Sequence, residues 1–250
     1  MDYLPFLATA HRELEPQTYL EIGVSQGHSM ALSHCRSVGI DPLFSIKTEI
    51  DCHLTLFRTS SDEYFTRPDP LAPTGGQPFD LAFIDGLHLF EFTLRDFINA
   101  ERYCTPRSLI ILDDMLPRTV DEAARERHTY EWAGDLYPIL AVFDRYRPDL
   151  VVLPVDTTPT GMVVVFGLDP SNTALSDNYD EIMAEFRSPD PQPVPESVLD
   201  RLTAYAPERV LDAPFWRALA DAPRDASPAE VRALLDEPLR AGLGAQFAQA

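Results

Sequence analysis

The chain has 250 residues, of which 45% are hydrophobic and 24% are charged, a composition typical of a globular protein with one sizeable core. It carries 40 acidic and 20 basic residues, and the net charge of −20 argues against a nucleic-acid partner while suiting a cationic ligand. No stretch approaches the ~18 consecutive apolar residues of a membrane span, and residues 1–16 lack a signal-peptide pattern. The three cysteines have no metal-like spacing and read as reduced thiols, so we expect a cytoplasmic protein without a membrane partner.

Apolar runs and helical periodicities alternate along the chain. A short helix within residues 1–15 is expected to cover one edge of a sheet. Strands are predicted at residues 19–22, 37–40, 54–57, 80–84, 108–112, 150–155 and 162–166. Helices are predicted at 28–35, just after 59–62, at 90–98 and at 136–143, with Ser61 or Asp62 capping the second of them. Residues 67–78 form a loop, and the long polar segment 115–132 is a candidate lid over the site.

The turn after the first strand is bounded by Gly23 and Gly27, and a helix is predicted to begin at His28. Strand, glycine turn and helix are the arrangement in which an α/β protein presents a helix N-terminus to a ligand. An ordinary connection between a strand and a helix would use the same two glycines. This turn alone therefore favours a nucleotide-type ligand only weakly.

The last two strands are separated by residues 156–161 alone. A parallel crossover needs a dozen or more residues, so the final strand should be antiparallel to its neighbours. The sequence thus predicts an α/β fold: a Rossmann-like, seven-stranded, mostly parallel sheet with a terminal antiparallel hairpin and helices on both faces. A usual dinucleotide-binding dehydrogenase keeps parallel strands joined by helices instead.

The proline-rich segment 188–195 divides the chain into a predicted core domain, 1–187, and a helical extension, 188–250. Ser227 and Glu230 form a predicted capping box in the extension. Phe215, Trp216 and Leu219 would be exposed apolar surface unless they pack on the core or on a second subunit. A homo-oligomer formed through these helices is therefore one expectation.

Acidic residues stand at four predicted strand ends. They are Glu21 after the first apolar run, Asp41 after the second strand, Asp85 after the fourth, and Asp113 with Asp114 after the fifth. Ligands bind parallel sheets at the carboxyl ends of their strands. Four acidic ends make a poor phosphate site and a good site for a sulfonium and an ammonium group. Alternatively, each carboxylate merely caps a helix.

The ordered motifs Leu20-Glu21-Ile22-Gly23-x-x-x-Gly27-x-Ser29, Gly39-Ile40-Asp41-Pro42, Ser61-Asp62, Phe79-Asp80-x-x-Phe83-Ile84-Asp85-Gly86-Leu87-His88 and Leu112-Asp113-Asp114 resemble a class I S-adenosylmethionine-dependent methyltransferase. The resemblance is greatest to small-molecule O-methyltransferases of the catechol and bacterial natural-product types, and it spans residues 18–168. It implies O-methylation of a small-molecule hydroxyl with S-adenosylmethionine as cofactor. Two alternatives stay open: an NAD-dependent oxidoreductase, and a non-catalytic member of the fold that acts as an interaction protein.

The resemblance also implies roles for individual residues. Glu21, Gly23, Gly27 and Ser29 would hold the methionine part of the cofactor, Asp41 the ribose, and Ser61 with Asp62 the adenine; Asp85 and His28 are further cofactor candidates. Asp85, Asp113 and Asp114 match the positions that bind a divalent cation in catechol-type enzymes, and oxygen ligands suit Mg²⁺. Here the third position is Asp, where those enzymes carry Asn.

The catalytic candidates are His88 and Asp85. His88 stands where the catechol-type enzymes have a lysine base, and an imidazole near its ordinary pKa can take a hydroxyl proton. Alternatively, His88 is a structural residue that bonds the loop of Asp113 and Asp114. Candidate substrate contacts in the polar segment are Arg118, His128, Tyr130 and Trp132.

Overall fold

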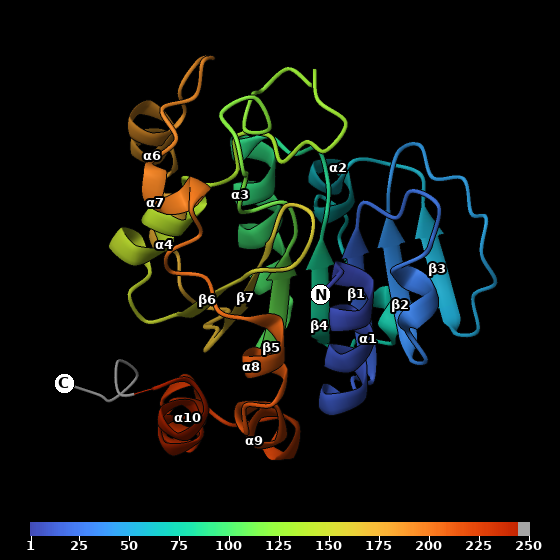
Figure 1. Cartoon of the computed structure of the whole chain (residues 1–250). Coiled ribbons are helices and arrows are strands. Elements are labelled where there is room, and N and C mark those ends of the chain that lie inside the picture. Colours follow the sequence, from blue (N-terminus) through green and yellow to red (C-terminus); the bar gives the residue numbers. More distant parts are fainter. Residues whose placement is uncertain (245–250) are drawn as a thin grey trace.

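The computed structural model describes residues 1–244 and contains the predicted seven-stranded sheet, in the order β3-β2-β1-β4-β5-β7-β6 (Figure 1). The strands are β1 (Thr18–Ile22), β2 (Arg36–Ile40), β3 (His53–Phe57), β4 (Phe79–Ile84), β5 (Cys104–Leu112), β6 (Val151–Val155) and β7 (Met162–Phe166). The strands β1 to β5 pair in parallel, and β7 runs antiparallel to both β5 and β6. The predicted fold class and its terminal hairpin are confirmed.

The register of the parallel strands brings their carboxyl ends level. Ile22 of β1 pairs with Ile40 of β2 and with Ile84 of β4, and Ile84 pairs with Leu112 of β5. The residue after each of these positions therefore begins a turn at the same edge of the sheet, which is where an α/β protein binds its ligand.

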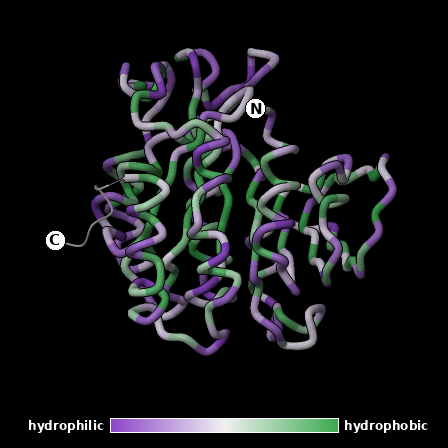
Figure 2. Tube along the Cα trace, turned by 60° about the horizontal axis from the view of Figure 1, so that its bottom comes forward, coloured by the Kyte–Doolittle hydropathy of each residue, from purple (hydrophilic) through white to green (hydrophobic). Residues whose placement is uncertain are grey.

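Two hydrophobic cores lie on the two faces of the sheet. One face is covered by α1 (Tyr3–Leu14), α8 (Pro207–Leu211), α9 (Phe215–Asp221) and α10 (Pro228–Leu243); the other by α2 (Ser61–Phe65), α3 (Phe90–Glu101), α4 (Ile139–Tyr146), α5 (Ala174–Asp177) and α6 (Tyr179–Phe186) (Figure 1). Figure 2 shows hydrophobic residues along the central strands, while the helices alternate between hydrophobic and hydrophilic positions. Each helix thus turns an apolar stripe to the sheet.

The predicted helix at residues 28–35 is wrong. The structure has only a one-turn 3₁₀ helix, η1 (Met30–Leu32), between β1 and β2. Eight residues of α-helix span about 12 Å, whereas returning along a five-residue strand requires roughly 17 Å. A helix over these residues would also leave too few residues for the turns at its two ends. The chain covers this return with turns and the single 3₁₀ turn instead. Residues 41–52, between β2 and β3, also contain no helix.

The C-terminal extension packs on the sheet rather than standing apart from it. Phe215, Trp216 and Leu219 are at most 1% exposed, and the Phe6 and Trp216 rings contact each other edge-on with centroids 6.4 Å apart. The Arg224 guanidinium donates to the buried Asp80 carboxylate at 2.6 Å. The predicted capping box of Ser227 and Glu230 is present at the start of α10. Before these helices, α7 (Glu196–Leu199) follows the proline-rich segment.

Two shorter elements complete the described chain. The 3₁₀ helix η2 (Ala72–Thr74) lies in the loop predicted at residues 67–78. Ser60, rather than Ser61 or Asp62, caps α2 by accepting a hydrogen bond from the Glu63 amide. Within residues 1–244, no helix is long and apolar enough to cross a membrane.

Candidate active site

A cleft of about 600 Å³ opens at the carboxyl ends of β1, β2, β4 and β5. Its walls also include Tyr3 at the start of α1, the α3 residues Phe92 and Asp96, and residues of the segment between β5 and α4. A larger cavity of about 950 Å³ lies between β6, α4 and α10, but no predicted site residue lines it. We place the site in the smaller cleft, because the aligned strand ends and the acidic groups meet there.

The cleft brings together part of the predicted cofactor set. Gly23, Asp41, Ser61 and Asp85 line it, as do Asp113, Asp114 and His88. Glu21, Gly27, His28, Ser29 and Asp62 are not among the lining residues. The structure thus separates residues that face the cleft from residues that can act only by supporting it.

Glu21 and Ser29 belong to the supporting group. The Glu21 carboxyl is fully buried, and it accepts hydrogen bonds from the Tyr19 hydroxyl at 2.7 Å and the Ser29 hydroxyl at 2.8 Å. Burial raises the pKa of Glu21 to about 8, although both hydrogen bonds favour the carboxylate. This contact ties β1 to the start of η1 beneath the glycine turn.

Gly23 permits a close approach between two turns. Its φ is +92°, and a Cβ there would lie 1.7 Å from the carbonyl oxygen of Asp85. Only glycine fits this position, because any side chain would displace the turn after β4. Across the cleft, the two carboxylate oxygens of Asp41 accept hydrogen bonds from the amides of Ser25 at 2.7 Å and Leu43 at 2.6 Å, which fixes the orientation of that carboxylate.

The other predicted cofactor residues, Asp62, His28 and Gly27, do not line the cleft. Asp62 forms a forked ion pair with the Arg95 guanidinium, with its shortest contact at 2.7 Å. His28 is exposed on the glycine turn, and Gly27, with φ +85°, packs against Ile46.

His88 lies between two carboxylates at the centre of the site. Its Nε2 is 3.0 Å from Asp85 Oδ1 and 3.1 Å from Asp114 Oδ2. Its Nδ1 lies 2.9 Å from the backbone carbonyl oxygen of Trp132. A carbonyl oxygen only accepts hydrogen bonds, so Nδ1 carries a proton and Nε2 is the nitrogen that exchanges one.

The backbone of this cluster is constrained. His88 and Asp114 both adopt left-handed φ values, +53° and +61°, which are uncommon for non-glycine residues. The Thr160 hydroxyl donates to Asp114 Oδ1, and Asp113 Oδ1 accepts from the Asp114 amide at 2.9 Å. Both carboxylates are thereby held in fixed orientations.

The electrostatics follow from burial and mutual repulsion. Burial, and the neighbouring Asp114 and Asp85, raise the pKa of Asp113 well above its usual range. Burial is also the main cause that raises the pKa of Asp114 to about 7. Burial disfavours the charged imidazole of His88, but the charge of Asp114 and the hydrogen bond that Asp85 accepts from the ring outweigh it and raise the pKa of His88 to about 10. Without a cation in the cluster, His88 is therefore an imidazolium at neutral pH.

The cluster also fits a divalent cation. Asp85, His88 and Asp114 each offer one ligand atom, and these three atoms lie within 4.8 Å of one another. The sequence predicted Asp85, Asp113 and Asp114; the structure groups His88 with two of these, and Asp113 stands outside the group. A set of two carboxylates and an imidazole is less selective for Mg²⁺ than an all-oxygen set. It also suits Mn²⁺ or Fe²⁺.

The segment between β5 and α4 covers the cluster, as the lid prediction requires. The Trp132 ring stacks on the His88 ring with centroids 5.0 Å apart and planes at 16°. Gly134, with φ +65°, passes so close to His88 that a Cβ would lie 1.8 Å from the His88 carbonyl oxygen. Tyr130 also lines the cleft, with 89% of its surface exposed. Two candidate substrate contacts thus face the cleft.

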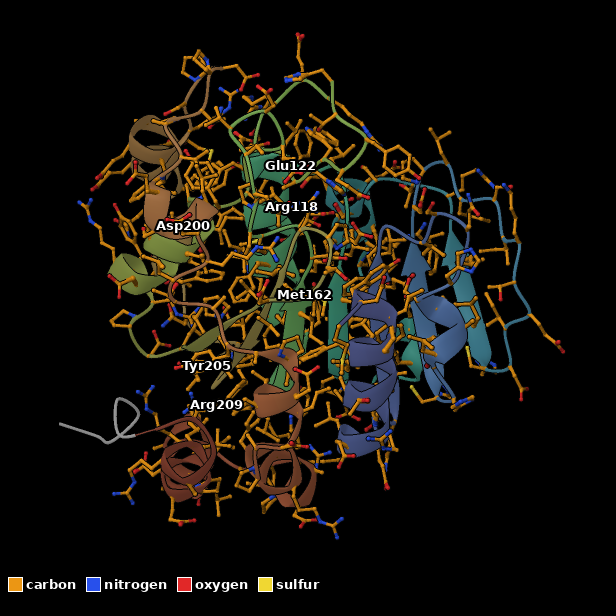
Figure 3. All side chains as sticks on the ribbon, in the orientation of Figure 1. Arg118, Glu122, Met162, Asp200, Tyr205 and Arg209 are labelled. Carbon is orange, nitrogen blue, oxygen red and sulfur yellow. The ribbon has the colours of Figure 1, made fainter. Side chains whose placement is uncertain are left out.

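The other two candidate contacts lie away from it. Arg118 pairs with Glu122 at 2.6 Å on the same segment (Figure 3), and His128 is exposed, 3.7 Å from Asp121. Arg127 lines the cleft in their place and donates to the Tyr130 carbonyl oxygen at 2.7 Å. Sequence patterns offered no signal for Arg127, nor for Tyr3, which lies in a helix that packs its apolar face on the core.

The C-terminal extension reaches the same region through Arg201. Its guanidinium donates to the carbonyl oxygens of Leu116 at 2.8 Å and Pro159 at 2.6 Å. These carbonyls belong to the two loops that carry Asp114 and Thr160, so Arg201 joins the loops behind the cluster.

The comparison with known families agrees with this geometry. Residues 20–115 match the family model described as a methyltransferase domain. The predicted resemblance to a methyltransferase is confirmed over this range. The match begins in β1 and ends one residue after Asp114, so it contains every predicted cofactor and metal residue of the methyltransferase domain.

Solved structures of O-methyltransferases are similar to part of the chain, and two of them illustrate this. An O-methyltransferase from Bacillus cereus in complex with SAH has 15% identity and a TM-score of 0.47, covering 66% of this chain and 80% of that one. The O-methyltransferase TomG from Streptomyces achromogenes, involved in tomaymycin synthesis and solved with SAM, has 17% identity and a TM-score of 0.45, covering 66% and 78%. No curated protein matches the chain.

Proposed function

We propose that this chain transfers a methyl group from S-adenosylmethionine to a hydroxyl of a small-molecule acceptor. One observation carries the proposal: the part of the chain that matches a methyltransferase domain also forms the cleft of about 600 Å³. The strand ends lie level at this cleft and present Asp41, Asp85, Asp113 and Asp114. A cleft of this size falls in the range of about 300–1,000 Å³ of small-molecule sites. Its negative charge complements a sulfonium.

The residues in the cleft fit the proposed cofactor. The Asp41 carboxylate is held rigidly by two backbone amides and still has lone pairs for ribose hydroxyls. Gly23 and Asp85 line the same part of the cleft, where the methionine part would bind. Glu21 and Ser29, buried beneath that turn, keep its shape without facing the cleft.

His88 is the proposed proton acceptor, and Asp85 and Asp114 orient its ring. The Trp132 carbonyl oxygen accepts from Nδ1, which leaves Nε2, beside Asp85 and Asp114, as the nitrogen that would take the proton of the acceptor. A divalent cation bound by Asp85 and Asp114 would supply neutralising charge and polarise the acceptor oxygen. With the two carboxylates neutralised, His88 would lose the interaction that holds its proton and could act as a base. The stacked Trp132 covers one face of the His88 ring.

Calorimetry with S-adenosylhomocysteine and, separately, NADH tests the cofactor. We expect the first to bind and the second not to bind. Asp41→Asn should weaken the first by about tenfold or more, since a hydrogen bond to a charged acceptor contributes ~1.5–3 kcal/mol. Asp144→Asn, at an exposed residue of α4, is the matched control. Binding of NADH without S-adenosylhomocysteine would overturn the proposal, and methyl transfer to a panel of phenols and catechols would extend it.

A further inference from the structure

Cys35 and Cys52 are two thiols that the sheet brings next to each other. β3 is the edge strand of the sheet and lies beside β2 (Figure 1). Arg36 of β2 pairs with His53 of β3 in parallel register, and each cysteine stands one residue before its member of that pair. Neighbouring strands lie about 5 Å apart, and a disulfide joins two Cα atoms about 4.4–6.8 Å apart. The two cysteines therefore begin their strands at a spacing that a disulfide can bridge.

Both cysteine side chains meet the same two hydroxyl groups. The Ser33 and Ser37 hydroxyls are hydrogen-bonded to each other at 2.8 Å, and the Cys35 sulfur lies 3.3 Å from the Ser33 hydroxyl. Hydrogen bonds from these same two hydroxyls favour the thiolate of Cys52. The two sulfurs thus lie on the same face of the sheet in one cluster, and both are free thiols that are partly exposed.

A metal ion is the other partner that two neighbouring thiols could serve. Within residues 1–244, the group of three His, Cys, Asp or Glu ligand atoms that lie within 4.8 Å of one another is the His88 cluster. The exposed His34 and His53 stand next to the cysteines in the sequence, yet neither completes such a group with them. Structural zinc takes four protein ligands, so a pair of thiols without a third ligand fits a disulfide better.

We infer that Cys35 and Cys52 form a reversible disulfide across the edge of the sheet. The oxidant is a small disulfide of the glutathione class. One cysteine thiolate attacks a sulfur of that disulfide and releases a thiol; the second thiolate then attacks the mixed disulfide at the protein sulfur and releases another. The two protein thiols are oxidised, the small disulfide is reduced to two thiols, and the protons lost by the cysteines pass to the leaving groups.

The bond encloses residues 36–51, which comprise β2 and most of its connection to β3. That connection contains no helix, and β3 pairs with a strand on one side only. Closing this loop restricts the unfolded chain, so the oxidised form should be the more stable one. The cysteines stand at the amino ends of their strands and the cleft lies at the carboxyl ends, so the bond is independent of the proposed methyl transfer.

The reactivity of the pair determines the conditions of the test. Burial raises the pKa of both thiols above the ordinary value, although the serine hydroxyls favour the thiolates. Only the thiolate exchanges, so the reaction is slow at neutral pH and faster at higher pH. The full chain is therefore equilibrated with excess oxidised glutathione at pH 8.5, and the intact mass and the number of alkylated thiols are measured.

Wild type should lose two free thiols and carry no glutathione, leaving the buried Cys104 reduced. Cys52→Ser and Cys35→Ser should each carry one glutathione on the remaining partner, because neither keeps a thiol that resolves the mixed disulfide. Cys104→Ala is the matched control and should form the disulfide as wild type does. A wild-type chain that keeps all three thiols, or that retains glutathione on Cys35 or Cys52, would overturn the inference.

Thermal unfolding tests whether the folded sheet holds the pair in position. Oxidised wild type should unfold about 6–12 °C above its reduced form, as expected for a closed loop of this length in a chain of this size. Cys104→Ala should show the same difference, whereas Cys35→Ser and Cys52→Ser should show none. An oxidised form that unfolds below the reduced form would mean that the bond distorts the sheet, and would likewise contradict the inference.

Discussion

The protonation of His88 gives the most direct test of the cluster. Its pKa is raised from 6.5 to about 10 in the folded chain, so His88 stabilises the fold fully below about pH 6.5 and loses that contribution as the pH rises through 10. By proton linkage, the loss between pH 8 and 10.5 is roughly 2–3 kcal/mol. Asp114, whose pKa is about 7, is already ionised throughout this window and so does not offset the loss.

Urea unfolding in EDTA at pH 8 and pH 10.5 measures this loss. The free energy of unfolding should fall by roughly 2–3 kcal/mol more in wild type than in His88→Gln. His53→Gln, at an exposed histidine of β3, should follow wild type. NMR of histidine-labelled protein should show one imidazole that stays protonated at pH 8.5. Parallel losses in wild type and His88→Gln, or a His88 signal that titrates near pH 6.5, would refute the reasoning.

Three further predictions concern the metal, the extension and the core. The affinity for Mn²⁺, measured by calorimetry, should fall about tenfold or more in Asp114→Asn. His88→Gln should keep most of the Mn²⁺ affinity but lose turnover. If both variants lost Mn²⁺ affinity equally, His88 would be a metal ligand instead of the base. Arg201→Met should lower both turnover and the unfolding temperature, because two loop carbonyls lose their donor, while the exposed Arg217→Met should change neither. Trp216→Ala should destabilise the chain by about 3–5 kcal/mol in urea unfolding, and Leu234→Ala, at a 47% exposed residue, by far less.

The sheet was predictable because each strand carries its own local signal. Apolar runs that end in Asp41, Asp85 and Asp113 identify both the strands and the edge at which they finish, and the six-residue link before β7 determines its direction. The helix expected at residues 28–35 failed because periodicity does not measure whether the chain is long enough to return along its strand. An α-helix over these residues would be too short to span the distance back along the strand.

The details of the site depend on contacts between distant residues. The sequence pattern placed Glu21 in the cofactor site, but its carboxyl is turned into the core toward Tyr19 and Ser29. The orientation of His88 depends on the carbonyl of Trp132, 44 positions away. Asp96 stands in an amphipathic helix, where one acidic residue is expected on the solvent side, so its burial could not be read from the sequence.

The packing of Phe6 of α1 against Trp216 of α9 has a consequence for how the chain folds. These two rings are 210 positions apart, and they share one core with β-strands from the middle of the sequence. Closing so long a loop costs entropy that only the completed core repays, so chains with such distant contacts fold slowly. During synthesis, α1 can acquire this partner only after α9 has left the ribosome. Until then the face of the sheet beneath α8, α9 and α10 stays exposed, and this is where chaperones would bind the nascent chain.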